Sequence, residues 1–232
     1  MTWRDHLVAL DTETDGPDPE DARIITACVG TANRDGWTPT NWTLKPERPI
    51  PAEAQAVHGL TTEWAAETGQ DRATGLRSIR DALVAAWDAG LPVVAYNTVF
   101  DLTVLDRELR RIGEPGLRIT GPVIDPLVID KAVDRFRKGS RKLIDVAGHY
   151  GIRLNASDAH GAEPDALAAV RVAWKLATHP DLPTDLRALH TFQVEAFESQ
   201  RRSFIEYRRR VGNPIDDESV DWPIRPWLGV AA

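Results

Sequence analysis

Two patterns of apolar residues run along this chain. Short unbroken apolar runs that stop at a polar residue, such as residues 6–10 before Asp11, are typical of buried strands. Longer stretches in which apolar residues recur every three or four positions, as between Leu76 and Trp87, are typical of amphipathic helices. These patterns predict strands over residues 6–10, 23–30, 42–44, 91–96 and 118–124, and helices over residues 75–89, 100–112, 126–135, 143–150 and 164–178.

The order of these elements indicates the fold class. Three strands joined by short turns predict an antiparallel meander, and the strands that follow alternate with helices. Between the third strand and the helix over residues 75–89, loops bounded by prolines are predicted. We therefore expect an α/β fold in which a mixed five-stranded sheet is flanked by helices.

The C-terminal part of the chain follows a different pattern. Pro180 and Pro183 interrupt the last amphipathic helix, which suggests a first domain over residues 1–180. Thr184 is then predicted to cap a long helix that ends near Val211 in a cluster of arginines. Residues 213–232 are rich in Pro and Trp and show no period. We expect residues 181–232 to form a helical extension with an irregular tail that packs on the surface or on a partner.

Composition narrows the class of protein. The chain has 232 residues, of which 42% are hydrophobic and 27% charged, as in soluble globular proteins. Its single cysteine, Cys28, excludes an internal disulfide framework and a cysteine-rich zinc site. No apolar run approaches the roughly 20 residues that span a bilayer, and the N-terminus shows no signal-peptide pattern. We expect a cytoplasmic protein with no membrane partner.

The net charge of −7 bears on nucleic-acid binding. A protein that holds nucleic acid by neutralising many phosphates is expected to be basic overall. Any nucleic-acid role must therefore depend on a small contact patch or on bound cations. Surplus carboxylates are weak evidence for cations, because hard divalent ions need oxygen ligands.

Four acids lie where predicted strands end or helices begin. Asp11 and Glu13 follow the first strand and, if the backbone stays extended, point to the same side. Asp101 and Asp165 fall in the first turns of two helices, where the helix dipole alone favours an acid. Pro164 next to Asp165 suits the first position of a helix. Each acid, like a lone histidine such as His160, has an ordinary structural explanation.

Their conjunction is more specific. The chain reads Asp-Thr-Glu-Thr at residues 11–14, Asn-Thr-Val-Phe-Asp at 97–101 and His-Gly-Ala-Glu-Pro-Asp-Ala at 160–166. In this order the motifs resemble those of the DEDDh family, the DnaQ-like 3′-to-5′ exonucleases of ribonuclease H-like fold. Residues 57–61 resemble the family's loop between its first two motifs, and residues 123–127 its strand-to-helix junction. The resemblance covers about residues 6–178.

The resemblance implies a role for each acid. Asp11, Glu13 and Asp165 would hold one divalent ion, with Asp11 bridging to a second ion that Asp101 supports through water. Oxygen ligands favour Mg²⁺ or Mn²⁺ for both ions. His160 would be the general base, since its ordinary pKa of about 6.5 suits proton transfer near neutral pH.

Other residues are weaker candidates for holding the substrate. Thr12, Thr14 and the loop of His58, Gly59 and Leu60 could contact the terminal nucleotide, although His58 could equally stabilise a turn. Asn97 and Phe100 are candidates too, with a strand-end hydrogen bond and a core contact as alternatives. Residues 137–142 are basic and could follow phosphates or form a solvated loop, and Arg208, Arg209 and Arg210 are equally ambiguous. Asp125 and Asp145 are interpreted as acids near helices, outside the site.

The sequence thus predicts a metal-dependent exonuclease that removes 5′-mononucleotides from the 3′ end of single-stranded or frayed DNA. An exoribonuclease with the same site is the first alternative, and a non-catalytic module that binds a polymerase is a remote one. The sequence leaves open a replisome partner, the choice between proofreading, repair and a phage or plasmid role, and the oligomeric state.

Overall fold

A computed structural model describes residues 3–154 and 161–229 of the chain. Its centre is a five-stranded sheet in the order β3-β2-β1-β4-β5. The first three strands pair antiparallel, whereas β4 runs parallel to β1 and β5 parallel to β4. The predicted mixed sheet is confirmed. The strands are β1 (Leu7–Thr14), β2 (Ile24–Asn33), β3 (Gly36–Thr43), β4 (Val93–Val94) and β5 (Val123–Ile124).

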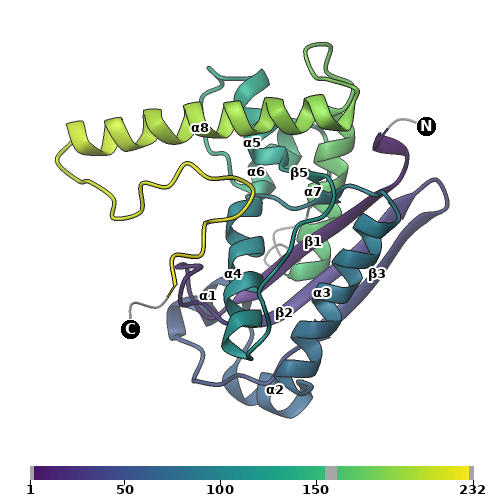
Figure 1. Ribbon diagram of the computed structural model, residues 1–232, viewed down its shortest axis with the longest axis vertical. Coiled ribbons are helices and arrows are strands. Elements are labelled where there is room, and N and C mark those ends of the chain that lie inside the picture. The colour runs from purple at the N-terminus through teal and green to yellow at the C-terminus, as the bar shows by residue number, and fades with distance from the viewer. Residues whose placement is uncertain (1–2, 155–160, 230–232) are drawn as a thin grey trace.

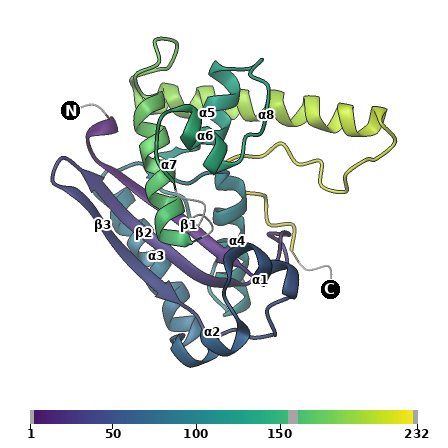
Figure 2. The same ribbon diagram turned by 180° about the vertical axis from the view of Figure 1, so that it is seen from behind.

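Helices cover both faces of the sheet because its central strand, β1, is apolar on both sides. Val8 and Leu10 of β1 face α3 and α4, and Leu7 and Ala9 face α5, α6 and α7, as the alternation of side chains along a strand requires. Figure 1 shows α3 and α4 in front of the sheet, and Figure 2 shows α7 in front of the opposite face. These helices are α3 (Arg72–Asp88), α4 (Thr98–Arg111), α5 (Pro126–Val133), α6 (Leu143–His149) and α7 (Ala162–Leu176).

Two helices and most of one strand differ from the predictions. The region predicted to be loop contains α1 (Ala52–His58) and α2 (Thr62–Thr68), which are too short to show a helical period. The strand predicted over residues 42–44 is the end of β3, whose polar first half lies at the sheet edge and includes Pro39. A short 3₁₀ helix, Trp3–Asp5, precedes β1.

Other boundaries also shift. Strands were predicted over residues 91–96 and 118–124. In each of these ranges only two residues, those of β4 and β5, pair with a neighbouring strand. Helix α7 begins at Ala162, so Pro164 is its third residue and not its first, still within the first turn where a proline is tolerated.

The C-terminal helix and tail pack against the rest of the chain. Helix α8 (Leu186–Arg210) is capped by Asp185, whose side chain accepts two backbone N–H bonds, and not by Thr184. Its Leu189 and Gln193 are fully buried. The tail after α8 then returns beside α4 (Figure 1), where Trp222 joins the core cluster of α3 and α4.

Candidate active site

Three elements bring the predicted acids together. Strand β1 carries Asp11 and Glu13 near its carboxyl end, and the first turn of α7 carries Asp165. One carboxylate oxygen from each of these three residues lies within 4.8 Å of the others. Asp101, buried in the first turn of α4, accepts a 2.7 Å hydrogen bond from the Thr12 hydroxyl between Asp11 and Glu13. All four acids therefore meet at the carboxyl end of the central strand.

The electrostatics of the cluster reflect this crowding. Burial, and then the charges of Asp165 and Asp101, raise the pKa of Glu13 to about 8. Burial raises the pKa of Asp101 to about 7, although the hydrogen bond from Thr12 acts in the opposite direction. The pKa of Asp11 is raised well above its ordinary value by burial and then by the three neighbouring acids. The acids repel one another, and positive charge at this place would relieve the repulsion.

The donor set fits hard divalent cations. Carboxylate oxygens from several elements are the ligands that Mg²⁺ and Mn²⁺ prefer. No histidine or cysteine takes part in the group of Asp11, Glu13 and Asp165. Among the described residues, this is the one group of three or more acidic, histidine or cysteine side chains close enough to hold an ion. The residues present therefore fit the predicted metals.

Asp125 fixes the entrance of α4 and thereby positions Asp101. Its buried carboxylate accepts hydrogen bonds from the backbone N–H groups of Asn97 at 3.1 Å and Thr98 at 2.9 Å. It also caps α5 through the N–H of Leu127 at 2.9 Å. Asp125 is a positioning residue, although the sequence interpretation placed it outside the site. The sequence feature that could have indicated this role is an acid directly before a proline at the end of a strand.

The residues predicted to contact the terminal nucleotide lie around the end of β1. The Thr12 hydroxyl donates to Asp101, and the Thr14 hydroxyl donates to the Gly16 carbonyl at 2.8 Å. His58 ends α1, with Nε2 3.3 Å from the Thr14 carbonyl oxygen.

Its other ring nitrogen, Nδ1, accepts from the Leu60 N–H at 3.0 Å, across Gly59 in the left-handed conformation. His58 thus does stabilise a turn, and this turn lies against the strand that carries Asp11 and Glu13. Its role in substrate binding stays a prediction.

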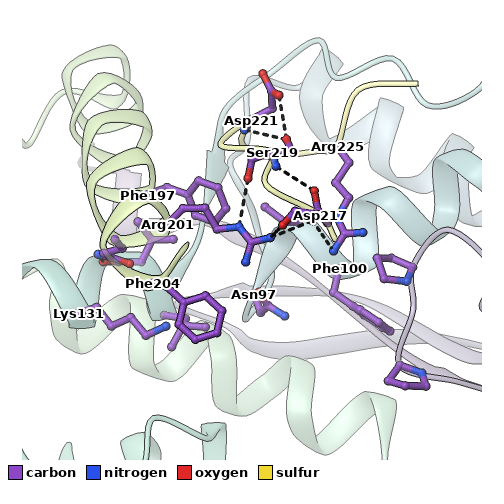
Figure 3. Close-up of a pocket in the computed structure, with 16 residues that line it drawn as sticks. Asn97, Phe100, Lys131, Phe197, Arg201, Phe204, Asp217, Ser219, Asp221 and Arg225 are labelled. Atoms are coloured by element: carbon purple, nitrogen blue, oxygen red, sulfur yellow. Dashed lines mark hydrogen bonds and ion pairs between the residues drawn. The ribbon is translucent and has the colours of Figure 1, made fainter. Parts of the chain in front are cut away.

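Asn97 and Phe100 line a cavity of about 370 Å³, which we call the α4–α8 cavity. Asn97 is exposed and has φ of 70°, the one positive φ outside glycine among the described residues. Phe100 is partly buried and packs against the core, as the structural alternative expected. Figure 3 shows both among the residues that line the cavity.

The C-terminal region supplies much of the wall of this cavity, which the sequence did not indicate. Helix α8 and the tail contribute residues that include Phe197, Arg201, Phe204, Asp217 and Arg225. Asp217 pairs with both arginines at 3.0 Å, so their charges are partly compensated.

His160, the predicted general base, lies outside the described residues. Its motif continues at Gly161, which precedes α7 and leads to Asp165. The assignment of the base therefore still rests on the sequence motif.

A mixed sheet of this topology, with acids at the carboxyl end of its central strand, is the arrangement of a ribonuclease H-like nuclease. The RNase_T family model, described as exonuclease, matches residues 8–173. The chain therefore belongs to this exonuclease family, whose members are the DnaQ-like DEDDh enzymes.

Relatives and solved structures agree with this assignment. A DNA polymerase III subunit epsilon-like protein of Rhodobacter capsulatus is 29% identical over 175 residues, which are 73% of this chain and 23% of that protein. The uncharacterized exonuclease CP81 of Escherichia phage 186 is 42% identical over 59 residues, which are 25% of this chain and 29% of that protein. The chain thus spans less than a third of these curated relatives.

Escherichia coli exonuclease I shares the fold. Its zinc-bound complex with single-stranded DNA superposes with a TM-score of 0.67 at 19% identity, covering 86% of this chain and 45% of that chain. A second exonuclease I structure gives a TM-score of 0.66 at the same identity, covering 46% of that chain. In the described part of this chain, none of the helices has the length and apolar character needed to cross a membrane.

Proposed function

We propose that this chain is a 3′-to-5′ exonuclease that releases nucleoside 5′-monophosphates from the 3′ end of single-stranded or frayed DNA. The observation that carries the proposal is the convergence of Asp11, Glu13 and Asp165 within 4.8 Å, with Asp101 held beside them by Thr12. These four acids belong to three separate motifs that fall in the family's order, with Asp11 and Glu13 in the first of them.

In the proposed mechanism, the chain's residues would hold two Mg²⁺ or Mn²⁺ ions and would orient the reacting phosphate. When bound, such ions activate the attacking water and neutralise charge on the leaving oxygen. Asp11, Glu13 and Asp165 would hold one ion, and Asp101 would support the other. Asp125 and Thr12 would keep Asp101 in place. Asp125 accepts a hydrogen bond from the N–H of Thr98 at the start of α4, and Thr12 donates one to Asp101 itself.

His160 would accept the proton of the attacking water. Its place in the sequence, five residues before Asp165, supports this role. Thr14, His58, Gly59 and Leu60 would surround the terminal nucleotide at the end of β1. Because these contacts involve only the last one or two nucleotides, they are compatible with a net charge of −7.

DNA as substrate is supported by the names of similar proteins. Solved exonuclease I structures include complexes with single-stranded DNA and with dT13 and dA16 oligonucleotides. The relative described as a polymerase III epsilon-like protein suggests a polymerase or replisome partner. We place the activity in the cytoplasm.

Digestion of a labelled oligonucleotide tests the proposal. A 5′-labelled DNA strand should shorten stepwise in Mg²⁺ or Mn²⁺, a 3′-labelled strand should release labelled mononucleotide first, and EDTA should stop both. Asp165→Ala should lose more than about 100-fold in rate, since even outer partners of metal ligands are worth about 10–100-fold.

Glu163→Ala is the matched control, because Glu163 lies in the same turn of α7 but accepts a hydrogen bond from Asn41 at 2.6 Å. We expect it to keep its activity. Equal activity of Asp165→Ala and wild type would contradict the proposed site. Faster degradation of a matched ribo-oligonucleotide would replace DNA with RNA as the substrate.

A further inference from the structure

A second cavity, of about 480 Å³, lies between α5 and α8, outside the cluster of acids. One wall carries four cations, Lys131, Arg135, Arg137 and Arg141, and α8 contributes Gln200 and Ser203 to the other wall. We call this cavity the basic groove. It is formed in part by α8, which lies outside the residues matched by the exonuclease family.

The charge of the basic groove contrasts with that of the whole chain. Residues 131–142 contain six Lys and Arg and one acid, in a chain with net charge −7. Buried Asp130 fixes two of the cations, because its Oδ2 accepts from Arg137 at 2.6 Å and from Arg141 at 2.5 Å. The predicted solvated loop is therefore folded inward in part. Asp130 fixes the positions of Arg137 and Arg141 and compensates part of their charge, and Asp134 also pairs with Arg137 at 3.1 Å.

Two other cations remain available to a ligand. Among the described residues, no acid lies within ion-pair distance of Lys131 or Arg135. Next to Arg135 stands Phe136, whose side chain is 88% exposed, with the guanidinium 5.7 Å from the ring centroid. An exposed aromatic ring among cations is typical of surfaces that bind single-stranded nucleic acid, where bases stack on rings and cations meet phosphates.

The basic groove is continuous with the α4–α8 cavity, since Lys131 and Gln200 line both. Figure 3 shows Lys131 and Phe204 at one end of the α4–α8 cavity, Phe100 at the other and Asn97 between them. Phe100 directly precedes Asp101 of the acid cluster, and Asn97 lies four residues before it. The two cavities thus form a path from Phe100, the residue before Asp101, to Arg135, the residue before the exposed Phe136.

We propose that the basic groove binds the part of a single DNA strand that lies upstream of the 3′ end in the active site. The phosphates of the strand contact Lys131, Arg135 and the two arginines held by Asp130, and one base stacks on Phe136. This inference rests on the proposed function for the polarity of the strand. Duplex DNA would not present an unstacked base to Phe136, so the groove selects single strands.

The test measures binding by fluorescence anisotropy in EDTA, where the strand stays intact, with a labelled dT15 as the probe. The double variant Arg135→Ala/Phe136→Ala should bind dT15 about tenfold more weakly than wild type, because it loses a stacked base and a phosphate contact. Both side chains are exposed, so the fold should be unaffected, and circular dichroism checks this. Trp174→Ala/Lys175→Ala is the matched control, an exposed aromatic–cation pair on α7 with the ammonium 5.4 Å from the ring centroid.

Single variants separate the two contacts. Arg135→Ala should reduce the slope of log affinity against log salt by about 0.7, the value for one phosphate contact on a single strand. Phe136→Ala should weaken binding with an unchanged slope. Equal affinity of the double variant and wild type, or equal affinity for dT15 and a 15-base-pair duplex, would overturn the proposal.

A second substrate keeps this result separate from the proposed function. Thymidine 5′-monophosphate p-nitrophenyl ester has no upstream nucleotides, so wild type and the double variant should hydrolyse it at the same rate. If wild type hydrolyses the ester but the double variant binds dT15 as tightly as wild type does, the proposal for the basic groove is wrong and the proposed exonuclease activity stands. If wild type hydrolyses neither the ester nor the oligonucleotides, the proposed exonuclease activity is wrong. The anisotropy measurement would then still show whether the basic groove binds a single strand.

Discussion

Glu13 shows how strongly a single side chain at this site depends on distant parts of the chain. Its position two residues after Asp11 predicted that it joins the cluster only in combination with the motifs of Asp101 and Asp165 and the family that they resemble. Its pKa of about 8 could not be predicted, because it depends on burial and on the charges of Asp165 and Asp101, which other elements supply. In the absence of metal, the clustered acids therefore oppose folding.

The first prediction concerns stability in EDTA. The pKa of Glu13 is raised from its ordinary 4.5 to about 8. Between pH 4.5 and pH 8, Glu13 therefore keeps its proton in the folded state and has lost it in the unfolded state. The free energy of unfolding therefore falls as pH rises from about 4.5 to 8. Glu13→Gln should remove this contribution, so the variant should gain about 1–2 kcal/mol over wild type at pH 8 and little at pH 5.

Thermal melts of both proteins at pH 5, 6.5 and 8 measure the effect. Glu67→Gln on α2, an exposed glutamate, is the control and should follow wild type at every pH. Added Mn²⁺ should stabilise wild type more at pH 8 than at pH 5. A gap between Glu13→Gln and wild type that is the same at all three pH values would show that the cluster is not strained by its charges.

At the scale of elements, α4 shows what periodicity can and cannot predict. Its apolar face at Leu102, Leu105 and Leu109 was predicted and is fully buried. The helix is also buried at several charged positions, including Arg107 and Glu108, which no hydrophobic pattern indicates. They are buried because partners from distant segments pair with them, as when Arg72 contacts Glu108 and Glu20 accepts from Arg107 at 2.7 Å. Such pairs can be recognised only once the fold is known.

The junction between β4, β5 and α4 depends on a single buried carboxylate, that of Asp125. Asp125 and Asp145 look alike in sequence, as acids near helix starts, but only Asp125 is buried and accepts bonds from Asn97 and Thr98. Asp125→Ala leaves these N–H groups unsatisfied and removes the cap of α5, so it should cost about 2–5 kcal/mol.

Asp145→Ala should cost less than about 1 kcal/mol, because an exposed acid contributes only its interaction with the helix dipole. Urea unfolding of the two variants provides the comparison. Asp125→Asn, which keeps the size of the side chain, should fold and yet hydrolyse DNA more slowly, since the start of α4 positions Asp101. Similar unfolding midpoints for the two alanine variants would show that the junction does not depend on the Asp125 carboxylate.

At the scale of the whole molecule, the order of elements was enough to predict the sheet. A meander followed by alternating helices and strands leads to few topologies, because parallel strands need a crossover and short turns favour hairpins. The path of the tail could not be predicted, because its sequence shows no period. The tail is held by single hydrogen bonds to distant residues, which no repeating pattern indicates. Arg107 donates to the carbonyl of Pro226 at 2.9 Å, and the N–H of Arg225 donates to the Thr103 hydroxyl at 3.0 Å.

These contacts bear on whether residues 181–232 form a separate unit. Helix α8 places Leu189 in the core on one face of the sheet, and the tail places Trp222 in the core on the other. Gln193 of α8 also accepts from the backbone N–H of Asp125 at 2.7 Å. The extension therefore reaches the same junction that positions Asp101, and we infer that it unfolds together with the exonuclease part.

Two tryptophans of the tail test this inference. Trp222 is 8% exposed and packs in the core cluster, whereas Trp227 is 42% exposed and contacts the guanidinium groups of Arg107 and Arg110. Trp222→Ala should lower the free energy of unfolding by about 3–5 kcal/mol, as expected for a buried aromatic residue. Trp227→Ala should cost only about 0.5–1 kcal/mol, the value of an exposed cation–π contact. Calorimetry should show one transition that Trp222→Ala shifts as a whole, and a separate early transition for the tail would show that the extension folds independently.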